Sequence, residues 1–289
     1  PAAGTLVKAK TALLFDWDNR WAIQDVKALS ENTKNYEKTC IGIWKEFQKL
    51  GVEMDVVSSN DDLSDYKVVV APMLYLLQSG TAENLQKFVK NGGQLLATYF
   101  TGYVDKDTLC YLGGFPGDGL AELFGVISEE IDTLYPSDRN SLCFLDGKKW
   151  TVYDYAEILR VQDAQILASY GTDFYEGSAA LTVKEWESDT HTGENGRAYY
   201  IAARVAPEEM GSLFETMLAN AGIAVKDLPG EVEYHQRQGE DTTYEFYLNH
   251  GKEKSVIKNV TGRNLLTGED INGTLSLAAY DVAVIGKQS

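Results

Sequence analysis

The chain lacks several features that would point to a particular class of protein. Its 289 residues include 26 basic and 43 acidic side chains, which gives a net charge of −17. Nucleic acids and anionic membrane surfaces bind to basic surfaces, so this charge argues against both as partners. No apolar run approaches the roughly 18 residues that a membrane-spanning helix needs. The first residues, PAAGTLVKAK, also show no signal-peptide core.

Cysteine and histidine are scarce as well. The cysteines are Cys40, Cys110 and Cys143, and the histidines are His191, His235 and His250. An odd number of cysteines without a Cys-x-x-Cys pair predicts neither a disulfide framework nor a zinc ribbon. A reducing compartment follows as the default, and we expect the cytoplasm. The histidines show no metal-ligand spacing, so each is expected on the surface or in a strand, and no metal or cofactor is predicted.

What the chain does have is an alternation of short apolar strands and amphipathic helices over its first hundred residues. Strands are predicted at residues 11–15, 52–57, 67–71 and 94–99, and helices at residues 36–50 and 81–90. Three consecutive valines, from Val68 to Val70, are typical of a strand buried on both faces. This order predicts an α/β fold with a doubly wound, mostly parallel sheet that resembles flavodoxin or the class I glutamine amidotransferases.

The second half of the chain changes in character. Strands are predicted at residues 150–155, 165–170 and 199–203, followed by a closing helix at 207–220. Beyond residues 226–230 the helical periodicity ends. Strands at 231–237, 243–249 and 280–285 remain, separated by turn signals such as Asn249-His250-Gly251 and Asn272-Gly273. We therefore expect a first domain at residues 1–226 and a small antiparallel β domain at residues 227–289.

The segment ALLFDWDNRW, residues 12–21, carries two carboxylates and two tryptophans at the carboxyl end of a buried strand. Sites of open α/β sheets lie at such strand ends. Its Asp-x-Asp pattern resembles the nucleophile motif of haloacid dehalogenase-type phosphatases, in which Asp16 would attack phosphorus and Asp18 would act as acid and base beside Mg²⁺. However, Arg20 stands where that chemistry needs a small hydroxyl residue. Asp61-Asp62 is also misplaced for the later acidic pair.

Other catalytic patterns are absent from the sequence. The strand end at residues 97–102 holds no Cys or Ser nucleophile, although the amidotransferase fold would place one there. The glycine-rich GGFPGDG segment, residues 113–119, has no phosphate-loop spacing and is predicted to form a turn in which Asp118 caps a helix at 120–124. A catalytic (β/α)₈ barrel needs roughly 250 residues, and the open-sheet pattern leaves no room for one.

A second resemblance extends along nearly the whole chain. Asp-Trp-x-x-x-Trp after a strand is similar to the start of the trimerisation domain of glycoside hydrolase family 42 β-galactosidases. Further segments follow in that family's order: VEMDVVSSNDDLSDYKVVVAPMLYLL, FVKNGGQLLATYFTGYVD, GGFPGDGLAELFGVISEEIDTL, YEFYLNH, LLTGED and AAYDVAVI. Each segment alone is weak evidence, but the ordered series is specific to the C-terminal region of these enzymes.

The resemblance implies a role. The chain would be a non-catalytic oligomerisation and accessory region that forms a homotrimer. It would lack the catalytic barrel, with its two glutamates, that hydrolyses terminal β-D-galactosides with retention. The strand-end aromatics Trp17, Trp21, Tyr99 and Phe100 would approach the active-site mouth of that barrel in the trimer. The alternatives that remain open are packing of these aromatics within the domain, a carbohydrate-binding module, and a stand-alone phosphatase that uses Asp16 and Asp18.

Overall fold

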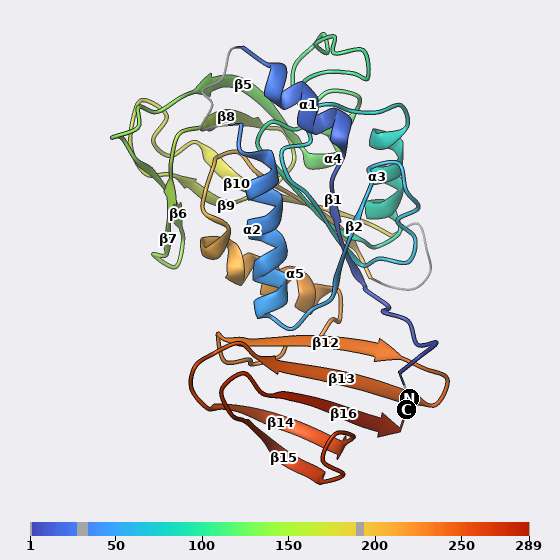
Figure 1. Ribbon diagram of the computed structural model, residues 1–289. Coiled ribbons are helices and arrows are strands. Elements are labelled where there is room, and N and C mark those ends of the chain that lie inside the picture. The colour runs from blue at the N-terminus through green and yellow to red at the C-terminus, as the bar shows by residue number, and fades with distance from the viewer. Residues whose placement is uncertain (1, 28–33, 189–193, 289) are drawn as a thin grey trace. The chain divides into compact units, whose positions relative to one another are not determined.

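The computed structural model describes residues 2–27, 34–188 and 194–288 (Figure 1). His191 lies outside the described residues. The chain divides into two compact units. The first, here called the β unit, comprises residues 1–11, 44–55 and 222–289. The second, the α/β unit, comprises residues 12–43 and 56–221.

The α/β unit is built on a nine-stranded sheet with the strand order β2-β1-β3-β4-β11-β10-β9-β6-β7. The strands are β1 (Thr11–Leu14), β2 (Met54–Val57), β3 (Val68–Ala71), β4 (Gln94–Thr98), β6 (Asn140–Phe144), β7 (Lys149–Val152), β9 (Gln165–Tyr170), β10 (Ala179–Trp186) and β11 (Gly196–Ile201). A separate antiparallel pair consists of β5 (Val126–Asp132) and β8 (Ala156–Val161). The sequence therefore predicted the strands of the first hundred residues at nearly their observed positions.

The sheet is mixed, and the prediction of a mostly parallel sheet was too simple. β3, β4 and β11 pair in parallel, whereas β11, β10, β9, β6 and β7 pair antiparallel. The connections between β6 and β7 and between β9 and β10 hold no helix, and such short connections join only antiparallel neighbours. The sequence analysis overlooked β5, β6, β8 and β10, because polar residues interrupt these strands and none holds an apolar run longer than three residues.

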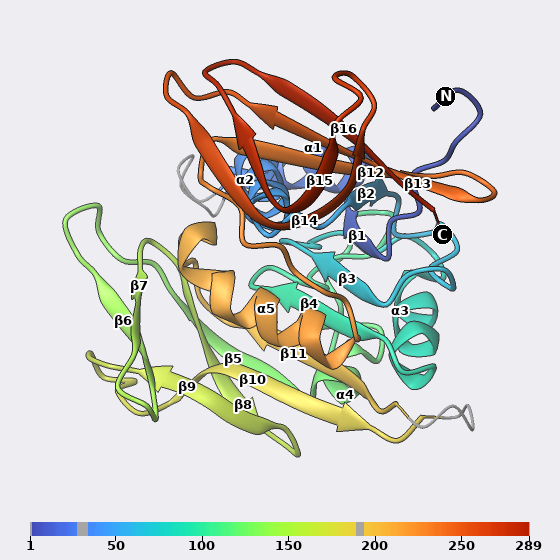
Figure 2. The ribbon, with the colours of Figure 1, turned by 90° about the horizontal axis from the view of Figure 1, so that it is seen from below.

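The helices of the chain are α1 (Trp17–Asp25), α2 (Tyr36–Lys49), α3 (Thr81–Lys90), α4 (Leu120–Phe124), a 3₁₀ turn (Pro207–Met210) and α5 (Gly211–Asn220). The prediction for α3 is confirmed, and the predicted closing helix is the 3₁₀ turn followed by α5. The capping prediction for Asp118 is wrong, because Gly119 in the left-handed region is the N-cap of α4 and no side chain caps it. Figure 2 shows α5 along one face of the sheet beside β11, where the Asn220 amide donates to the Tyr199 hydroxyl at 3.2 Å.

The β unit contains a five-stranded sheet with the order β12-β13-β16-β14-β15. Its strands are β12 (Val232–Gln238), β13 (Thr242–Asn249), β14 (Ser255–Asn264), β15 (Asp270–Leu277) and β16 (Val282–Gln288). All pairs are antiparallel, as predicted. The predicted turn at Asn272-Gly273 is wrong, because both residues lie inside β15 opposite an irregular stretch of β14. Nine buried residues, including Tyr247 and Ile285, form the core of this unit.

The three cysteines and His235 lie in the described part of the chain. Cys40, Cys110 and Cys143 are free thiols. The ring of His235 on β12 contacts the carboxylates of Glu53 and Glu233 at 3.1 and 2.6 Å, and these two acids raise the pKa of His235 to about 9, with Glu53 contributing most. Among the described helices, none has the length and apolar character needed to cross a membrane.

A close approach between α3 and β11 gives a test of the packing of the α/β unit. A Cβ atom added at Gly196, the first residue of β11, would lie 1.8 Å from the backbone oxygen of Val89 on α3. Gly196→Ala should therefore destabilise the protein by about 3 kcal/mol, as overpacking does. A urea unfolding curve measures this loss.

Gly211→Ala is the matched control, because a Cβ atom at Gly211 meets open space and the residue starts a helix. This variant should be stabilised by up to about 1 kcal/mol, since alanine has the better helix propensity. Equal unfolding midpoints for the two variants would contradict the packing seen at Gly196.

Candidate functional site

The carboxyl end of β1 leads into a short helix that exposes two aromatic rings. α1 begins at Trp17, and Trp21 follows one turn later on the same face. Their side chains are exposed, at 58% and 54%, and their ring centroids lie 6.2 Å apart. Large apolar side chains are costly to leave in water, so a pair of adjacent exposed tryptophans indicates a contact surface.

Contacts from several elements hold the tryptophans of α1 in position. Phe15 packs edge-on against Trp17 at 5.3 Å and stacks on Tyr36 of α2 at 5.1 Å. On the opposite side of α1, the buried Asn19 amide donates to the Met73 carbonyl at 3.0 Å and accepts the Leu76 backbone N–H at 2.9 Å. These bonds fix α1 to the segment after β3. The helix is therefore a rigid support for its exposed rings.

A cleft of about 430 Å³ opens beside Trp21. Its lining residues are Asp18, Trp21, Ala22, Asp25, Val26, Tyr75, Leu76, Lys106 and Thr108. The Asp18 carboxylate accepts a hydrogen bond of 2.6 Å from the Gln78 side chain. The lining combines two aromatic rings, which offer apolar faces, with carboxylate, hydroxyl and ammonium groups, which form hydrogen bonds. Such a lining suits a polar ligand that has an apolar face.

Tyr99 and Phe100 pack within the domain, which is the alternative that the sequence analysis left open for these aromatics. Both side chains are buried, at 2% and 1% exposure, and both rings pack on Tyr155, at 5.2 and 4.1 Å between centroids. Phe100 has a φ of 68°, in the left-handed region that side chains rarely adopt. Their burial removes both residues from the surface of this chain. Of the four predicted site residues, only Trp17 and Trp21 are exposed.

The sequence analysis missed Glu157 on β8, a carboxylate that is fully buried. Its Oε1 atom accepts the Phe100 backbone N–H at 2.9 Å and the Tyr103 hydroxyl at 2.9 Å, and its Oε2 atom accepts the Tyr200 hydroxyl at 2.7 Å. Burial raises the pKa of Glu157 to about 7, against the lowering effect of these hydrogen bonds. Glutamate is seldom buried in proteins, so the burial of a single glutamate in a strand cannot be recognised from the sequence.

The two aspartates of the phosphatase alternative make separate structural contacts. The Asp16 carboxylate accepts the Ser58 hydroxyl at 2.6 Å and the Ser59 backbone N–H at 3.2 Å, so it holds the loop after β2. Asp18 instead faces Gln78. Within the described residues, no group of three His, Cys, Asp or Glu side chains is placed to hold a metal ion. Asp16 therefore has a structural role in this loop.

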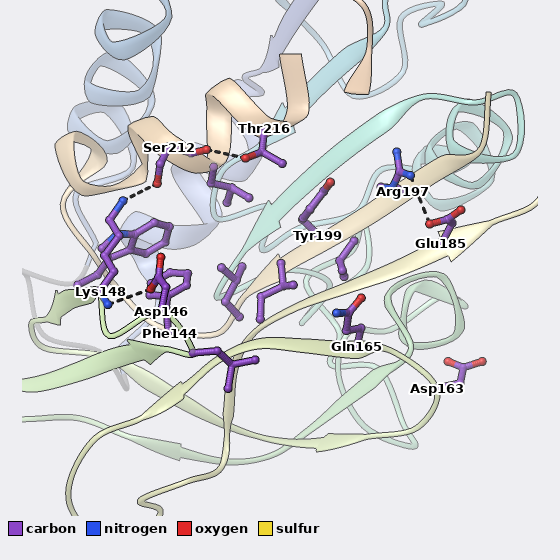
Figure 3. Close-up of a pocket in the computed structure, with 16 residues that line it drawn as sticks. Phe144, Asp146, Lys148, Asp163, Gln165, Glu185, Arg197, Tyr199, Ser212 and Thr216 are labelled. Atoms are coloured by element: carbon purple, nitrogen blue, oxygen red, sulfur yellow. Dashed lines mark hydrogen bonds and ion pairs between the residues drawn. The ribbon is translucent and has the colours of Figure 1, made fainter. Parts of the chain in front are cut away.

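Another cleft of the α/β unit, with a volume of about 730 Å³, lies over its antiparallel strands (Figure 3). Its apolar floor includes Leu167, Leu181 and Val183 from β9 and β10. Polar residues surround that floor: Asp146, Lys148, Asp163, Gln165, Glu185, Arg197, Tyr199, Ser212 and Thr216. In Figure 3 the Lys148 ammonium reaches the Ser212 hydroxyl of α5, and Arg197 pairs with Glu185 at 3.4 Å. An apolar floor with a charged rim is the composition of a protein contact surface.

Comparison with known proteins gives two family models that together cover most of the chain. The model of the β-galactosidase trimerisation domain matches residues 9–224, and that of the β-galactosidase C-terminal domain matches residues 231–287. The phosphatase interpretation is overturned by these matches.

Individual relatives agree with the family models. The chain is 37% identical over 296 residues to the β-galactosidase BglY of Alicyclobacillus acidocaldarius and 34% identical over 296 residues to Pbg of Clostridium perfringens. In each comparison the alignment covers 99% of this chain and 42% of the relative. The crystal structure of a β-galactosidase from Bacillus circulans sp. alkalophilus superposes with a TM-score of 0.89 at 30% identity, over 99% of this chain and 42% of that one. The chain thus spans about two fifths of the length of its relatives.

The buried carboxylate of Glu157 predicts a pH dependence of stability. The folded pKa of about 7 lies above the ordinary value of 4.5, so the folded state holds the proton more tightly than the unfolded state. The contribution of this group should therefore fall as the pH rises from 4.5 to 7, by about 3 kcal/mol in total. Urea unfolding of the wild type and Glu157→Gln across this range measures the difference.

Glu157→Gln removes the titrating group, so its stability should change less with pH than that of the wild type. Glu122→Gln is the control, because Glu122 is an exposed carboxylate of the same unit. If Glu157→Gln and Glu122→Gln followed the same pH curve, the raised pKa of Glu157 would be refuted.

Proposed function

The chain belongs to the β-galactosidases of glycoside hydrolase family 42, and we propose that it is the oligomerisation and accessory region of such an enzyme, with no catalytic activity of its own. The observation that carries this proposal is the pair of domain matches, which leave only short stretches of the chain unassigned. The catalytic work would belong to the part of the relatives that this chain does not match.

The architecture of the described residues supports a non-catalytic role. A retaining glycosidase needs two carboxylates about 5 Å apart on a rigid support, and a (β/α)₈ barrel is the support that the family resemblance implies. The two larger sheets of the described chain are an open nine-stranded sheet and a five-stranded antiparallel sheet. The whole enzyme would hydrolyse terminal β-D-galactosides with retention through a barrel domain outside this sequence.

Within such an enzyme, the chain would join three copies and present Trp17 and Trp21 to the barrel of a neighbouring subunit. The exposure of both rings and their fixation through Asn19 support this role, since a contact surface binds best when it is ordered in advance. Tyr99 and Phe100 are buried and would act only indirectly. The Phe100 ring packs edge-on against Tyr75, which lines the cleft beside Trp21. No cofactor is part of this proposal.

Three finer expectations from the sequence join the proposal. The first is the domain boundary at residue 226, supported by the gap between the two family matches at 224 and 231. The second is kinship of the parallel half of the sheet with the flavodoxin-like and glutamine amidotransferase-like folds. The third is a cytoplasmic location, supported by the free cysteines.

The solution mass tests whether oligomerisation resides in this chain. One chain has a mass of 32.0 kDa, and sedimentation equilibrium should give a species of three times that mass. The same preparation should leave a chromogenic β-galactoside intact. A monomer at high concentration would contradict the oligomerisation role, and turnover of the galactoside would contradict the non-catalytic role.

Substitution of the tryptophans tests the contact surface. Because both rings are exposed, Trp17→Ala and Trp21→Ala should each change the free energy of unfolding by less than about 1 kcal/mol. In an enzyme that carries the barrel, the same changes should raise KM for the galactoside several-fold or weaken the trimer. Phe174→Ala is the control, since Phe174 is an exposed aromatic residue on another loop. Full activity and an intact trimer in both tryptophan variants would argue against this role.

A further inference from the structure

A third cleft of the α/β unit differs from its surroundings in charge. It has a volume of about 420 Å³ and lies between the first turn of α2, the segments around residues 136–139 and 153–154, and the segment after β11. Its lining residues are Asn35, Lys38, Thr39, Pro136, Arg139, Tyr153, Asp154, Arg204, Val205, Ala206 and Pro207. Three of these side chains are cationic and one is a carboxylate, although the whole chain has a net charge of −17.

The two arginines of the cleft are held in place by the protein. The Arg139 guanidinium donates to the Pro136 carbonyl at 3.0 Å and lies 5.0 Å from the centre of the Tyr153 ring. Arg204 donates to both oxygens of Asp154, at 3.1 and 3.3 Å. A guanidinium group that is already oriented loses little freedom when it binds an oxyanion through two parallel hydrogen bonds.

The helix α2 adds a further favourable field. It is 14 residues long, and Lys38 and Thr39 of its first turn line the cleft together with the preceding Asn35. The amino end of a helix carries a partial positive charge and free backbone N–H groups, which attract anions. The amino end of α2 and the three cationic side chains therefore both favour a negatively charged ligand.

A buried hydroxyl lies next to these groups. Tyr99, the first residue after β4, is 2% exposed, and its hydroxyl makes no hydrogen bond of good geometry among the described residues. The groups that act on this hydroxyl include Thr39, Arg204 and Asp154, which line the cleft, and Cys40, which does not. Tyr99 itself does not line the cleft, so the attraction for a ligand rests on the cationic side chains and the amino end of α2.

We propose that this cleft is a binding site for a small molecule that carries an oxyanion, either a carboxylate or a phosphate group, held by Lys38, Arg139 and Arg204 at the amino end of α2. The cleft volume lies within the range of small-ligand sites. Asp154 neutralises part of the charge of Arg204, so Lys38 and Arg139 provide most of the attraction. The site is separate from the tryptophans of α1 and does not depend on the role proposed for them.

Inorganic phosphate is a suitable probe for this site. Calorimetric titration of the intact chain with phosphate, at an ionic strength held constant with chloride, should give saturable binding, and phosphate should raise the thermal midpoint. Lys38→Gln and Arg139→Gln should each weaken the binding about tenfold, since each removes a charged hydrogen-bond donor. Acetate tests whether a carboxylate is accepted as well.

Lys45→Gln is the matched control, because Lys45 is an exposed lysine farther along α2 and does not line the cleft. It should bind phosphate as the wild type does. Lys38 is also exposed, so Lys38→Gln should leave the fold intact. The comparison of Lys38→Gln with Lys45→Gln therefore stays valid even if Arg139→Gln is unstable. Absence of saturable binding would overturn the proposal. Equal weakening of phosphate binding in Lys38→Gln and Lys45→Gln would overturn it as well, because phosphate would then act as an adventitious ion only, through general charge screening.

Discussion

The α/β unit depends on one buried carboxylate that several elements share. Glu157 on β8 accepts hydrogen bonds from the backbone after β4, from Tyr103 in the following loop and from Tyr200 on β11. The Tyr170 hydroxyl of β9 donates to the backbone oxygen of the same residue at 2.9 Å. A buried carboxylate without partners would cost several kcal/mol, so each of these donors contributes to the stability of the unit. The network thereby connects the parallel and antiparallel halves of the sheet.

This constraint makes the end of β4 a centre of packing in the α/β unit. In the amidotransferase fold, the residue after this strand would be a nucleophile on a strained turn. Here Phe100 occupies a strained backbone position with a φ of 68°, and its N–H group binds the Glu157 carboxylate. The backbone conformation at this position is one that a reactive residue could adopt. Here, however, the position is occupied by the apolar ring of Phe100, and the buried acid Glu157 binds its N–H group. The exposed chemistry of the unit lies instead on α1 and at the amino end of α2.

The two candidate surfaces of the α/β unit differ in the ligands that they favour. Around Trp17 and Trp21, aromatic rings lie beside carboxylates, which suits contact with protein or sugar. Around Arg139 and Arg204, cations gather in a chain that is otherwise strongly acidic. Long-range repulsion from the net charge weakens anion binding everywhere else on the surface. A local cluster of fixed cations is therefore more selective here than it would be in a basic protein.

The sequence by itself determined the strands of the first hundred residues and the helix at 81–90, because continuous apolar runs and helical periodicity are local signals. It also determined the family, through an ordered series of segments that resembles the C-terminal region of these enzymes. It did not reveal α1, nor the strands β14 and β15, whose side chains alternate on a half-exposed sheet. Only the tertiary structure decided that Trp17 is exposed while Tyr99 and Phe100 are buried, although all three follow apolar strands. The reason is physical. Burial of a side chain and the pKa of an acid such as Glu157 depend on which distant segments pack against it, and the residue and its neighbours in sequence do not contain that information.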